Sequence, residues 1–292
     1  MKQRIINILS AILQAIDTLL CKMGIKKPTV VIALDGGICS QMFNYIKGAR
    51  FAETGCKVLY DTRWFLSKGT DLTGLFARDY ELPEMFPSLH IQYVSARKAK
   101  GWYSRFFKHS QSGGLVNVKD VKRTTYFGSQ YAQDKDAYAR LFPIYFNETT
   151  IRQIDVPWSR EEGVIHCGVH VRRGDLSIPR PEYGMVTKDY FPNAIEYVKD
   201  HYPHVRFHFF SDEMDWVEQN ILPRVDIRYD LIKGNKAWQD LALLSKCDII
   251  IASQGSFGRM AAQLRAHAEI ILCKSDLMTD YLGRDTHVTL ID

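Results

Sequence analysis

The second half of the chain alternates short apolar runs with amphipathic segments of about ten residues, and this alternation limits the possible folds more than any other feature. The pattern predicts strands at 163–171, 205–211, 225–229, 248–253 and 269–273, and helices at 189–201, 212–221, 236–246 and 257–267. Strands that alternate with helices of this length form a parallel sheet covered on both faces, so the predicted class is α/β. In such sheets, ligands bind where strand carboxyl ends meet helix amino ends.

The first half begins in the same way. After Pro28, an apolar run at 29–34 predicts a strand, and a glycine turn, a helix at 42–54 and a strand at 57–61 follow. At 292 residues the chain is long enough for two domains of ordinary size. We therefore expect two Rossmann-like domains, at 28–155 and 156–292, preceded by an amphipathic helix over 1–27.

The charge balance argues against a general nucleic-acid binder. Hydrophobic residues make up 46% of the chain and charged residues 24%, as in ordinary globular proteins. The formal net charge is only +5, which is too small an excess to coat a phosphate backbone but is compatible with local anion sites. We expect no nucleic-acid partner.

The N-terminal segment is apolar on one side only. Ile5, Ile8, Leu9, Ile12, Ile16, Leu19 and Leu20 recur at helical spacing, and Asn7, Ser10, Gln14 and Asp17 form a polar stripe. Gln14 and Asp17 would lie near the centre of any bilayer span, so we do not predict a transmembrane helix. The pattern fits an interfacial helix with Lys2, Arg4, Lys22, Lys26 and Lys27 at its ends, or a helix packed on the protein's own surface or a partner.

Two adjacent arginines follow the predicted strand at 163–171, in the stretch "GVHVRRGDLSIPR". Two neighbouring guanidinium groups repel each other, so Arg172 and Arg173 need a carboxylate, a phosphate or open water nearby. An arginine fork matches phosphate oxygens, and one arginine can hold a diphosphate while Asp175 holds the other. The alternative is a structural Arg–Asp pair on a solvated loop.

Two more strand ends carry polar residues. In "ASQGSFGRMAAQL" a Gly/Ser turn opens a helix at Ser256 and Phe257, which suits an anion, or Ser256 simply caps the helix. In "FSDE" the carboxylate of Asp212 can accept hydrogen bonds from guanine, or it can favour the start of the next helix.

Near the start, "DGGICSQMFNYIKGARFAE" places Gly36 and Gly37 in a sharp turn before a helix. The spacing is not a dinucleotide fingerprint, so the glycines either let a substrate approach the backbone or permit a tight turn. We predict Gly36, Gly37, Gln41 and Asn44 as acceptor-side residues.

The candidate metal ligands do not support a metal site. His166 and His170 lie on one predicted strand, about 13 Å apart at about 3.3 Å per residue, and cannot share a zinc. The "DKD" at 134–136 has the spacing of a divalent-metal motif, but it follows no strong strand. We therefore expect no metal and no cofactor.

Several motifs occur in the order found in a known family. The stretches "GGICSQMFNYIKGARFAETG", "YFGSQYAQDKDAYA", "HVRRGD", "FHFFSDEMDWVEQN" and "DLALLSKCDIIIASQGSFGRMAAQL" together resemble the α-1,2-fucosyltransferase family over about residues 31–265. The most specific element is the HxRRxD box, formed by His170, Arg172, Arg173 and Asp175.

This resemblance implies a GT-B type glycosyltransferase with two Rossmann-like domains, GDP-β-L-fucose as donor, inversion at the anomeric carbon and no metal requirement. It implies that Arg172 holds the diphosphate, Asp212 the guanine, and Ser256 with Phe257 the phosphate-side turn. His170 and Arg173 complete the donor site, and Asp175 is the candidate general base. The implied acceptor is the 2-hydroxyl of a galactoside.

The chain departs from the family pattern at two places. Residues 253–260 read "SQGSFGRM" where two tryptophans are usual, and Ser40 replaces an asparagine in the early motif.

The implied partners are GDP-fucose and a galactose-terminated oligosaccharide or lipid-linked glycan. We expect a cytoplasmic enzyme, held at the inner face of a bacterial membrane through the N-terminal helix. The alternatives are a transferase with another linkage or nucleotide sugar, and a non-catalytic GDP-sugar or glycan-binding protein.

Overall fold

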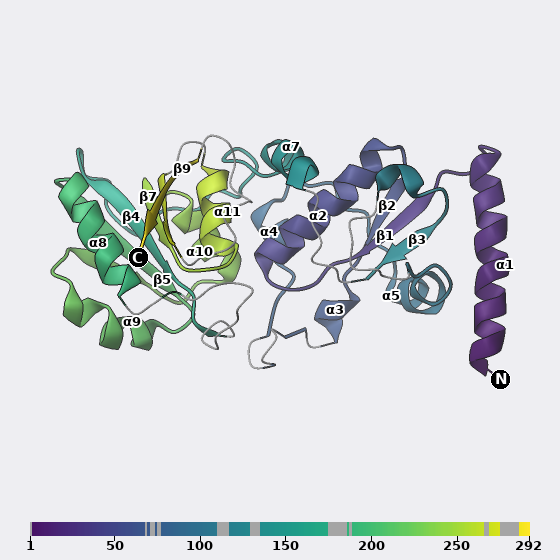
Figure 1. Ribbon diagram of the computed structural model, residues 1–292, viewed down its shortest axis with the longest axis horizontal. Helices are drawn as coiled ribbons and strands as arrows, with labels where there is room; N and C mark the ends of the chain where they lie inside the picture. Colours follow the sequence, from purple (N-terminus) through teal and green to yellow (C-terminus); the bar gives the residue numbers. More distant parts are fainter. Residues whose placement is uncertain are drawn as a thin grey trace. The chain divides into compact units, whose positions relative to one another are not determined.

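The computed structural model describes residues 2–67, 69–70, 74, 77–109, 117–128, 135–174, 186, 189–265, 269–274 and 286–292. These residues form two compact units, each with its own parallel sheet (Figure 1). Unit 1 comprises residues 1–80 and 88–142, and unit 2 comprises residues 81–87 and 143–292. The predicted α/β fold class with two Rossmann-like units is confirmed.

Unit 1 is built on a three-stranded sheet of order β2-β1-β3, in which β1 pairs in parallel with both neighbours. Its strands are β1 (Thr29–Ala33), β2 (Lys57–Asp61) and β3 (Thr125–Phe127). Its helices are α1 (Lys2–Lys22), α2 (Ile38–Glu53), α3 (Arg63–Leu66), α5 (Ala96–Lys98), the π-helical η1 (Ala99–Tyr103), α6 (Ser104–Phe106), the 3-10 turn η2 (Val118–Asp120) and α7 (Lys135–Tyr145), which runs into unit 2.

Unit 2 is built on a six-stranded parallel sheet of order β6-β5-β4-β7-β8-β9. Its strands are β4 (Ile165–Val171), β5 (Val205–Ser211), β6 (Tyr229–Ile232), β7 (Ile249–Ala252), β8 (Glu269–Cys273) and β9 (His287–Ile291). Its helices are α4 (Leu82–Met85), α8 (Tyr190–His201), α9 (Met214–Asn220), the 3-10 turn η4 (Leu222–Arg224), α10 (Ala237–Leu244) and α11 (Phe257–Leu264).

The order of these six strands is the 3-2-1-4-5-6 order of a Rossmann sheet. The chain starts in the middle at β4, winds outward through β5 and β6, and then returns to the other side of β4 at β7. The strand order therefore reverses between β4 and β7, and a ligand crevice is expected beyond their carboxyl ends.

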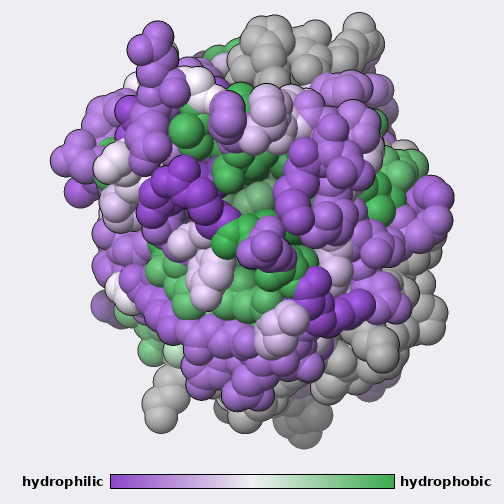
Figure 2. All heavy atoms as spheres, turned by 90° about the vertical axis from the view of Figure 1, so that its left-hand side faces the viewer, coloured by the Kyte–Doolittle hydropathy of each residue, from purple (hydrophilic) through white to green (hydrophobic). Residues whose placement is uncertain are grey.

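Helices pack on both faces of this sheet. The central strand β4 has large apolar side chains on one face and a glycine on the other, where a helix can approach closely. Cys167, Val169 and Val171 are fully buried against α8 and α9 in one core. On the opposite face, a Cβ at Gly168 would lie 2.4 Å from Leu244 of α10, so glycine is needed for close packing. The outer surface of unit 2 in Figure 2 is mostly hydrophilic, with apolar residues gathered near its centre.

Several predicted bounds agree with the structure, and others differ. The helix predicted at 42–54 is α2, which begins four residues earlier at Ile38, and α10 and α11 end before the predicted residues 246 and 267. The strands predicted at 57–61, 205–211 and 269–273 are found with those limits. The strand predicted at 225–229 is wrong, because the ladder with β5 begins only where Tyr229 pairs with Phe207. Val225 and Ile227 still pack against the core, which explains the misleading apolar alternation.

The units also divide at a different place from the predicted residue 155. The segment from Pro143 onward belongs to unit 2 because Phe146 packs on Phe86, with ring centroids 4.7 Å apart. The Arg152 backbone N–H also donates to the carbonyl of Met85 at 2.7 Å. The short strands β3 and β9 were not predicted.

Candidate active site

The HxRRxD box lies at the carboxyl end of β4, next to the point where the strand order reverses. His170 is inside the strand, and Arg172 and Arg173 follow it directly. The Arg172 backbone N–H donates to the Ser253 hydroxyl at the end of β7, at 2.9 Å. The backbone of Arg172 therefore links the carboxyl ends of β4 and β7, where the ligand crevice is expected.

The end of β5 supplies the carboxylates that offset the two guanidinium charges. The Arg172 side chain forms an ion pair with Asp212, whose other oxygen accepts a 2.8 Å hydrogen bond from the Arg173 backbone N–H. Glu213 accepts a hydrogen bond from the Gly174 N–H at 3.0 Å. From the sequence alone, Asp212 could either bind guanine or favour the start of a helix. In the structure its carboxylate holds residues 172–174, the arginine loop. Its predicted contact with guanine stays a prediction.

Arg173 points to a different partner from Arg172. Its guanidinium lies over the ring of Trp216 in α9, 4.3 Å from the ring centroid, and 3.7 Å from Glu213. A cation over an indole face is attracted by the ring quadrupole. Each of the two arginines therefore has an acidic residue beside it.

Gly174 is the glycine that lets this loop turn. Its φ is +37°, and a Cβ built there would lie 2.7 Å from Asp212 and 3.1 Å from Arg172. Both the backbone conformation and the crowding favour glycine at this position. The next residue, Asp175, lies outside the described residues, so its predicted roles in binding and catalysis stay predictions.

His170 is a buried, neutral part of the site. Burial, and then the nearby Arg172 charge, lower the pKa of His170 to about 3. Its Nδ1 lies 3.3 Å from the Ser253 hydroxyl, and its ring stacks on Phe257 with centroids 4.7 Å apart. The imidazole thus links the arginine loop to the predicted phosphate-side turn.

That turn runs from Ser253 to Phe257 and opens α11. Gly255 has a φ of +101°, and the buried Arg259 donates back to its carbonyl. Ser256 is the N-cap residue of α11, but its side chain makes no capping hydrogen bond in the described structure. The helix amino end and its N–H groups are oriented to favour an anion.

The acceptor-side residues predicted in unit 1 also form one cluster. Gly36, with a φ of +70°, and Gly37 make the turn between β1 and α2. Gln41 is fully buried, and its amide donates to the carbonyls of Gly36 and Asp79 at 3.1 and 2.8 Å. These bonds fix the shape of the turn, and contact of these residues with an acceptor stays a prediction.

One carboxylate in this cluster was not recognised from the sequence. Asp35 follows β1, is 4% exposed, and accepts a 3.1 Å hydrogen bond from the Asn44 amide. Lys47 lies on the same helix as Asn44, and burial lowers its pKa to about 8, although Asp35 opposes the shift. The signal for Asp35 was its place at a strand end beside two glycines.

Metal ligands do not come together in the part of the chain that the structure describes, where no group of three or more His, Cys, Asp or Glu side chains has the required spacing. His166, excluded above as a zinc partner of His170, instead lies 2.9 Å from His208 of β5. Asp134 of the "DKD" stretch lies outside the described residues.

Unit 2 therefore presents paired arginines and a helix amino end at the switch point of a Rossmann sheet, an arrangement typical of nucleotide-binding α/β enzymes. Residues 108–285 match the family model described as Glycosyl transferase family 11. The chain belongs to this family, the α-1,2-fucosyltransferase family, as the motif resemblance indicated, and is a glycosyltransferase.

Among similar proteins, the α-1,2-colitosyltransferase of Escherichia coli is 26% identical over 265 residues, covering 81% of this chain and 87% of that protein. The galactoside α-(1,2)-fucosyltransferase 2 of Pongo pygmaeus is 34% identical over 116 residues, covering 38% of this chain and 34% of that enzyme. Among solved structures, NodZ α-1,6-fucosyltransferase soaked with GDP-fucose has 13% identity and a TM-score of 0.46, covering 82% of this chain and 94% of that one.

Proposed function

We propose that the protein transfers L-fucose from GDP-β-L-fucose to the 2-hydroxyl of a galactoside, with inversion at the anomeric carbon. The main support is the arginine loop at the β4–β7 switch point in a chain of the α-1,2-fucosyltransferase family. The acceptor hydroxyl attacks C1 of fucose as the bond from C1 to the GDP oxygen breaks. GDP leaves on the opposite face, and the hydroxyl proton passes to a base.

The negative charge that develops on departing GDP must be stabilised. Arg172 and Arg173 supply two cations, and the amino end of α11 supplies N–H donors and a helix dipole. These groups stay fixed during the reaction because Asp212, Glu213 and Ser253 hold the loop. We propose that transfer needs no metal ion, because these groups take the role that a divalent cation has in other transferases.

The base is one of two carboxylates. Asp175, in the HxRRxD box, is the candidate from the sequence. Asp35, which accepts a hydrogen bond from the predicted acceptor-side residue Asn44, is the second candidate. A general base typically raises the rate of the chemical step by about 100- to 10,000-fold. Of the two Asp→Asn variants, we therefore expect only the one at the true base to lose that much kcat while it keeps its affinity for GDP.

A different nucleotide sugar is the alternative donor. It is supported by the 26% identity to the α-1,2-colitosyltransferase, which extends over 81% of this chain, and by the altered turn at 253–260. A comparison of GDP-fucose with nucleotide-activated colitose decides between the two donors. A non-catalytic binding protein would bind GDP but turn over neither donor.

The experiment is release of GDP from GDP-fucose by the purified protein, with EDTA, over a panel of galactoside acceptors. We expect acceptor-dependent release, and NMR of the product to show the α-1,2 linkage. Arg172→Ala should lower kcat/KM by about 100-fold or more. Arg172→Lys should also be impaired, because lysine lacks the guanidinium fork.

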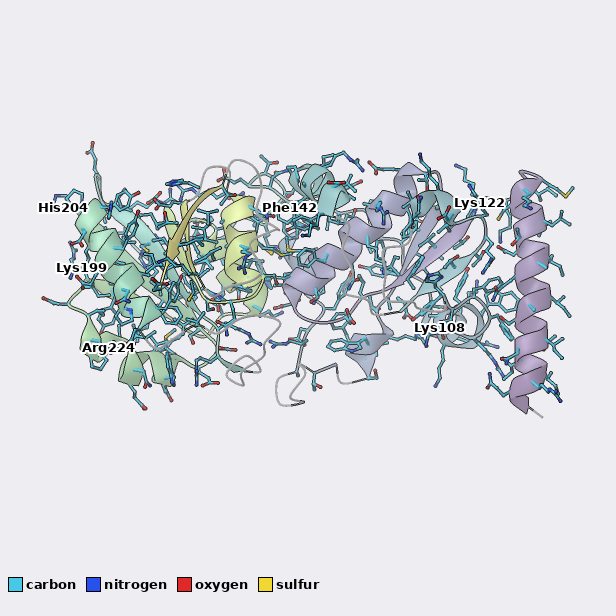
Figure 3. The ribbon with its side chains drawn as sticks, viewed as in Figure 1. Lys108, Lys122, Phe142, Lys199, His204 and Arg224 are labelled. Carbon is cyan, nitrogen blue, oxygen red and sulfur yellow. The ribbon has the colours of Figure 1, made fainter. Side chains whose placement is uncertain are left out.

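Arg224→Ala is the matched control, because it removes another arginine–aspartate ion pair at the surface of unit 2 (Figure 3). It should keep full activity. Unchanged kcat/KM in Arg172→Ala would refute the phosphate-holding role. Loss of activity in EDTA that Mg²⁺ or Mn²⁺ restores would refute metal independence.

A further inference from the structure

Helix α1 packs on unit 1 with its polar face. The Ser10 hydroxyl and the Gln14 amide both donate to the Phe106 carbonyl at the end of α6, each at 2.7 Å. Asp17 is 7% exposed, forms an ion pair with Lys26, and accepts a 2.6 Å hydrogen bond from the Thr124 backbone N–H. The polar stripe is therefore the side that holds α1 to the protein.

The apolar face of α1 consequently points away from unit 1, as the outward side chains in Figure 3 show. Its large apolar side chains are roughly half exposed or more: Ile5, Ile8, Leu9, Ile12, Ile16 and Leu19, with Met23 and Ile25 just beyond the helix. A surface helix of a water-soluble protein normally turns its apolar stripe inward. An exposed apolar strip of this length marks an interaction surface.

A basic and aromatic segment lies beside α1. Residues 96–108 comprise α5, η1, α6 and the two residues that follow α6. They contain no acidic residue and five exposed cations, Arg97, Lys98, Lys100, Arg105 and Lys108. Within the described part of the chain none of these five forms an ion pair. Trp102 in this segment is 43% exposed. A groove of about 630 Å³ runs between the segment and Arg63, lined by Ala96, Arg97, Lys100, Gly101 and Arg105.

The two features belong to one surface. α6 directly contacts α1, and Lys108 and Lys122 are drawn on the side of unit 1 that carries α1 (Figure 3). An apolar strip bordered by cations and a half-exposed tryptophan has the chemistry of the membrane interface, where tryptophan sits at headgroup level and lysine and arginine meet lipid phosphates.

We propose that α1 and residues 96–108 together dock unit 1 on an anionic lipid bilayer, with α1 lying in the plane of the interface. The helix from Gln3 to Lys22 is long and apolar enough to cross a membrane. Crossing would place Gln14 and Asp17 in hydrocarbon and would break their bonds to Phe106 and Thr124, whereas lying flat keeps every one of those bonds.

A second copy of the chain is a poorer occupant of this face. A symmetric dimer would place the same patch of unpaired cations opposite itself, and like charges across an interface are destabilising. Anionic headgroups instead provide the opposite charge. The proposal does not depend on the donor or acceptor, since binding is measured without any sugar.

The test is flotation of the full chain with vesicles of phosphatidylcholine alone and with a third of phosphatidylglycerol. We expect strong binding only to the anionic vesicles, weakened by high salt. Lys100→Gln/Arg105→Gln should reduce partitioning by about 30-fold, and Ile8→Gln/Ile16→Gln by about tenfold or more. All four positions are exposed, so far-UV circular dichroism and GDP binding should stay unchanged.

The control is Ile144→Gln/Lys199→Gln, which removes an equally exposed isoleucine and a surface lysine outside the proposed surface and should float like the parent. Failure of the parent to float, or equal flotation of all variants, would overturn the proposal. So would light scattering that shows a dimer converted to monomer by Ile8→Gln/Ile16→Gln without vesicle binding. If the parent floats but no donor turns over, the proposed function fails and the docking surface stands.

Discussion

Gly174→Ala tests whether the geometry of the arginine loop matters for catalysis. An alanine at a φ of +37° costs roughly 1–2 kcal/mol in backbone strain. In addition, its Cβ would lie 2.7 Å from Asp212 and 3.1 Å from Arg172, so the ion pair between them must move. A charge-assisted hydrogen bond, such as the one proposed from Arg172 to the diphosphate, contributes roughly 1.5–3 kcal/mol. Losing it in the transition state would lower kcat/KM by about tenfold to about 150-fold.

The matched control for this prediction is Gly163→Ala, before β4. Gly163 has a φ of +77°, but an added methyl group there would meet nothing within 4 Å, and the residue lies at the other end of that strand. Gly163→Ala should lose roughly 1–2 kcal/mol of the free energy of unfolding in urea from backbone strain, and Gly174→Ala at least as much, because its methyl group also displaces the ion pair. Only Gly174→Ala should lose kcat/KM for the proposed GDP-sugar donor. Equal kcat/KM values for the two variants would show that the Arg172–Asp212 geometry is not needed for transfer.

Two further predictions concern stability. Ser253→Ala should lower the free energy of unfolding by about 1–3 kcal/mol, because it leaves the Arg172 backbone N–H without its acceptor; urea unfolding with no change would mean that water replaces the hydroxyl. Burial lowers the pKa of His170 to about 3 and of His208 to about 4, so between about pH 6.5 and about pH 4 the unfolded chain binds more protons than the folded one. The free energy of unfolding should therefore fall as the pH is lowered through this window, by up to about 1.4 kcal/mol per pH unit for each histidine. His208→Phe should make this pH dependence less steep. An unchanged slope would mean that other groups cause it.

The sequence predicted most of what is local in this fold. Runs such as 205–211 and 269–273 are apolar along most of their length and lie between helical patterns, so their ends are clear. The strand at 229–232 was misplaced because pairing with Phe207, and not local hydrophobicity, determines where the ladder begins. The last strand, β9, was missed because several of its residues are exposed at the sheet edge and give only a weak apolar signal.

The sequence predicted where the site residues lie in the sheet better than it predicted which residues they contact. Strand ends identified Arg172, Asp212 and Ser256 as neighbours in one sheet, because parallel strands end at the same edge. The pairing of Arg172 with Asp212 joins residues 40 apart in the chain, which no local pattern specifies. For the same reason the sequence located the two faces of α1 but could not tell that Phe106 and Thr124 hold the polar one.

The short excursion of residues 81–87 into unit 2 has a practical consequence. The chain changes unit after Tyr80, after Pro87 and again after Phe142. Within the excursion, Glu84 accepts from the indole of Trp238 at 3.1 Å and from the Lys236 ammonium. A fragment of residues 143–292 would lack these partners and expose Phe146. Chimeras that exchange C-terminal halves between relatives must therefore transplant residues 81–87 together with that half, or the transplanted unit will lack part of its own core.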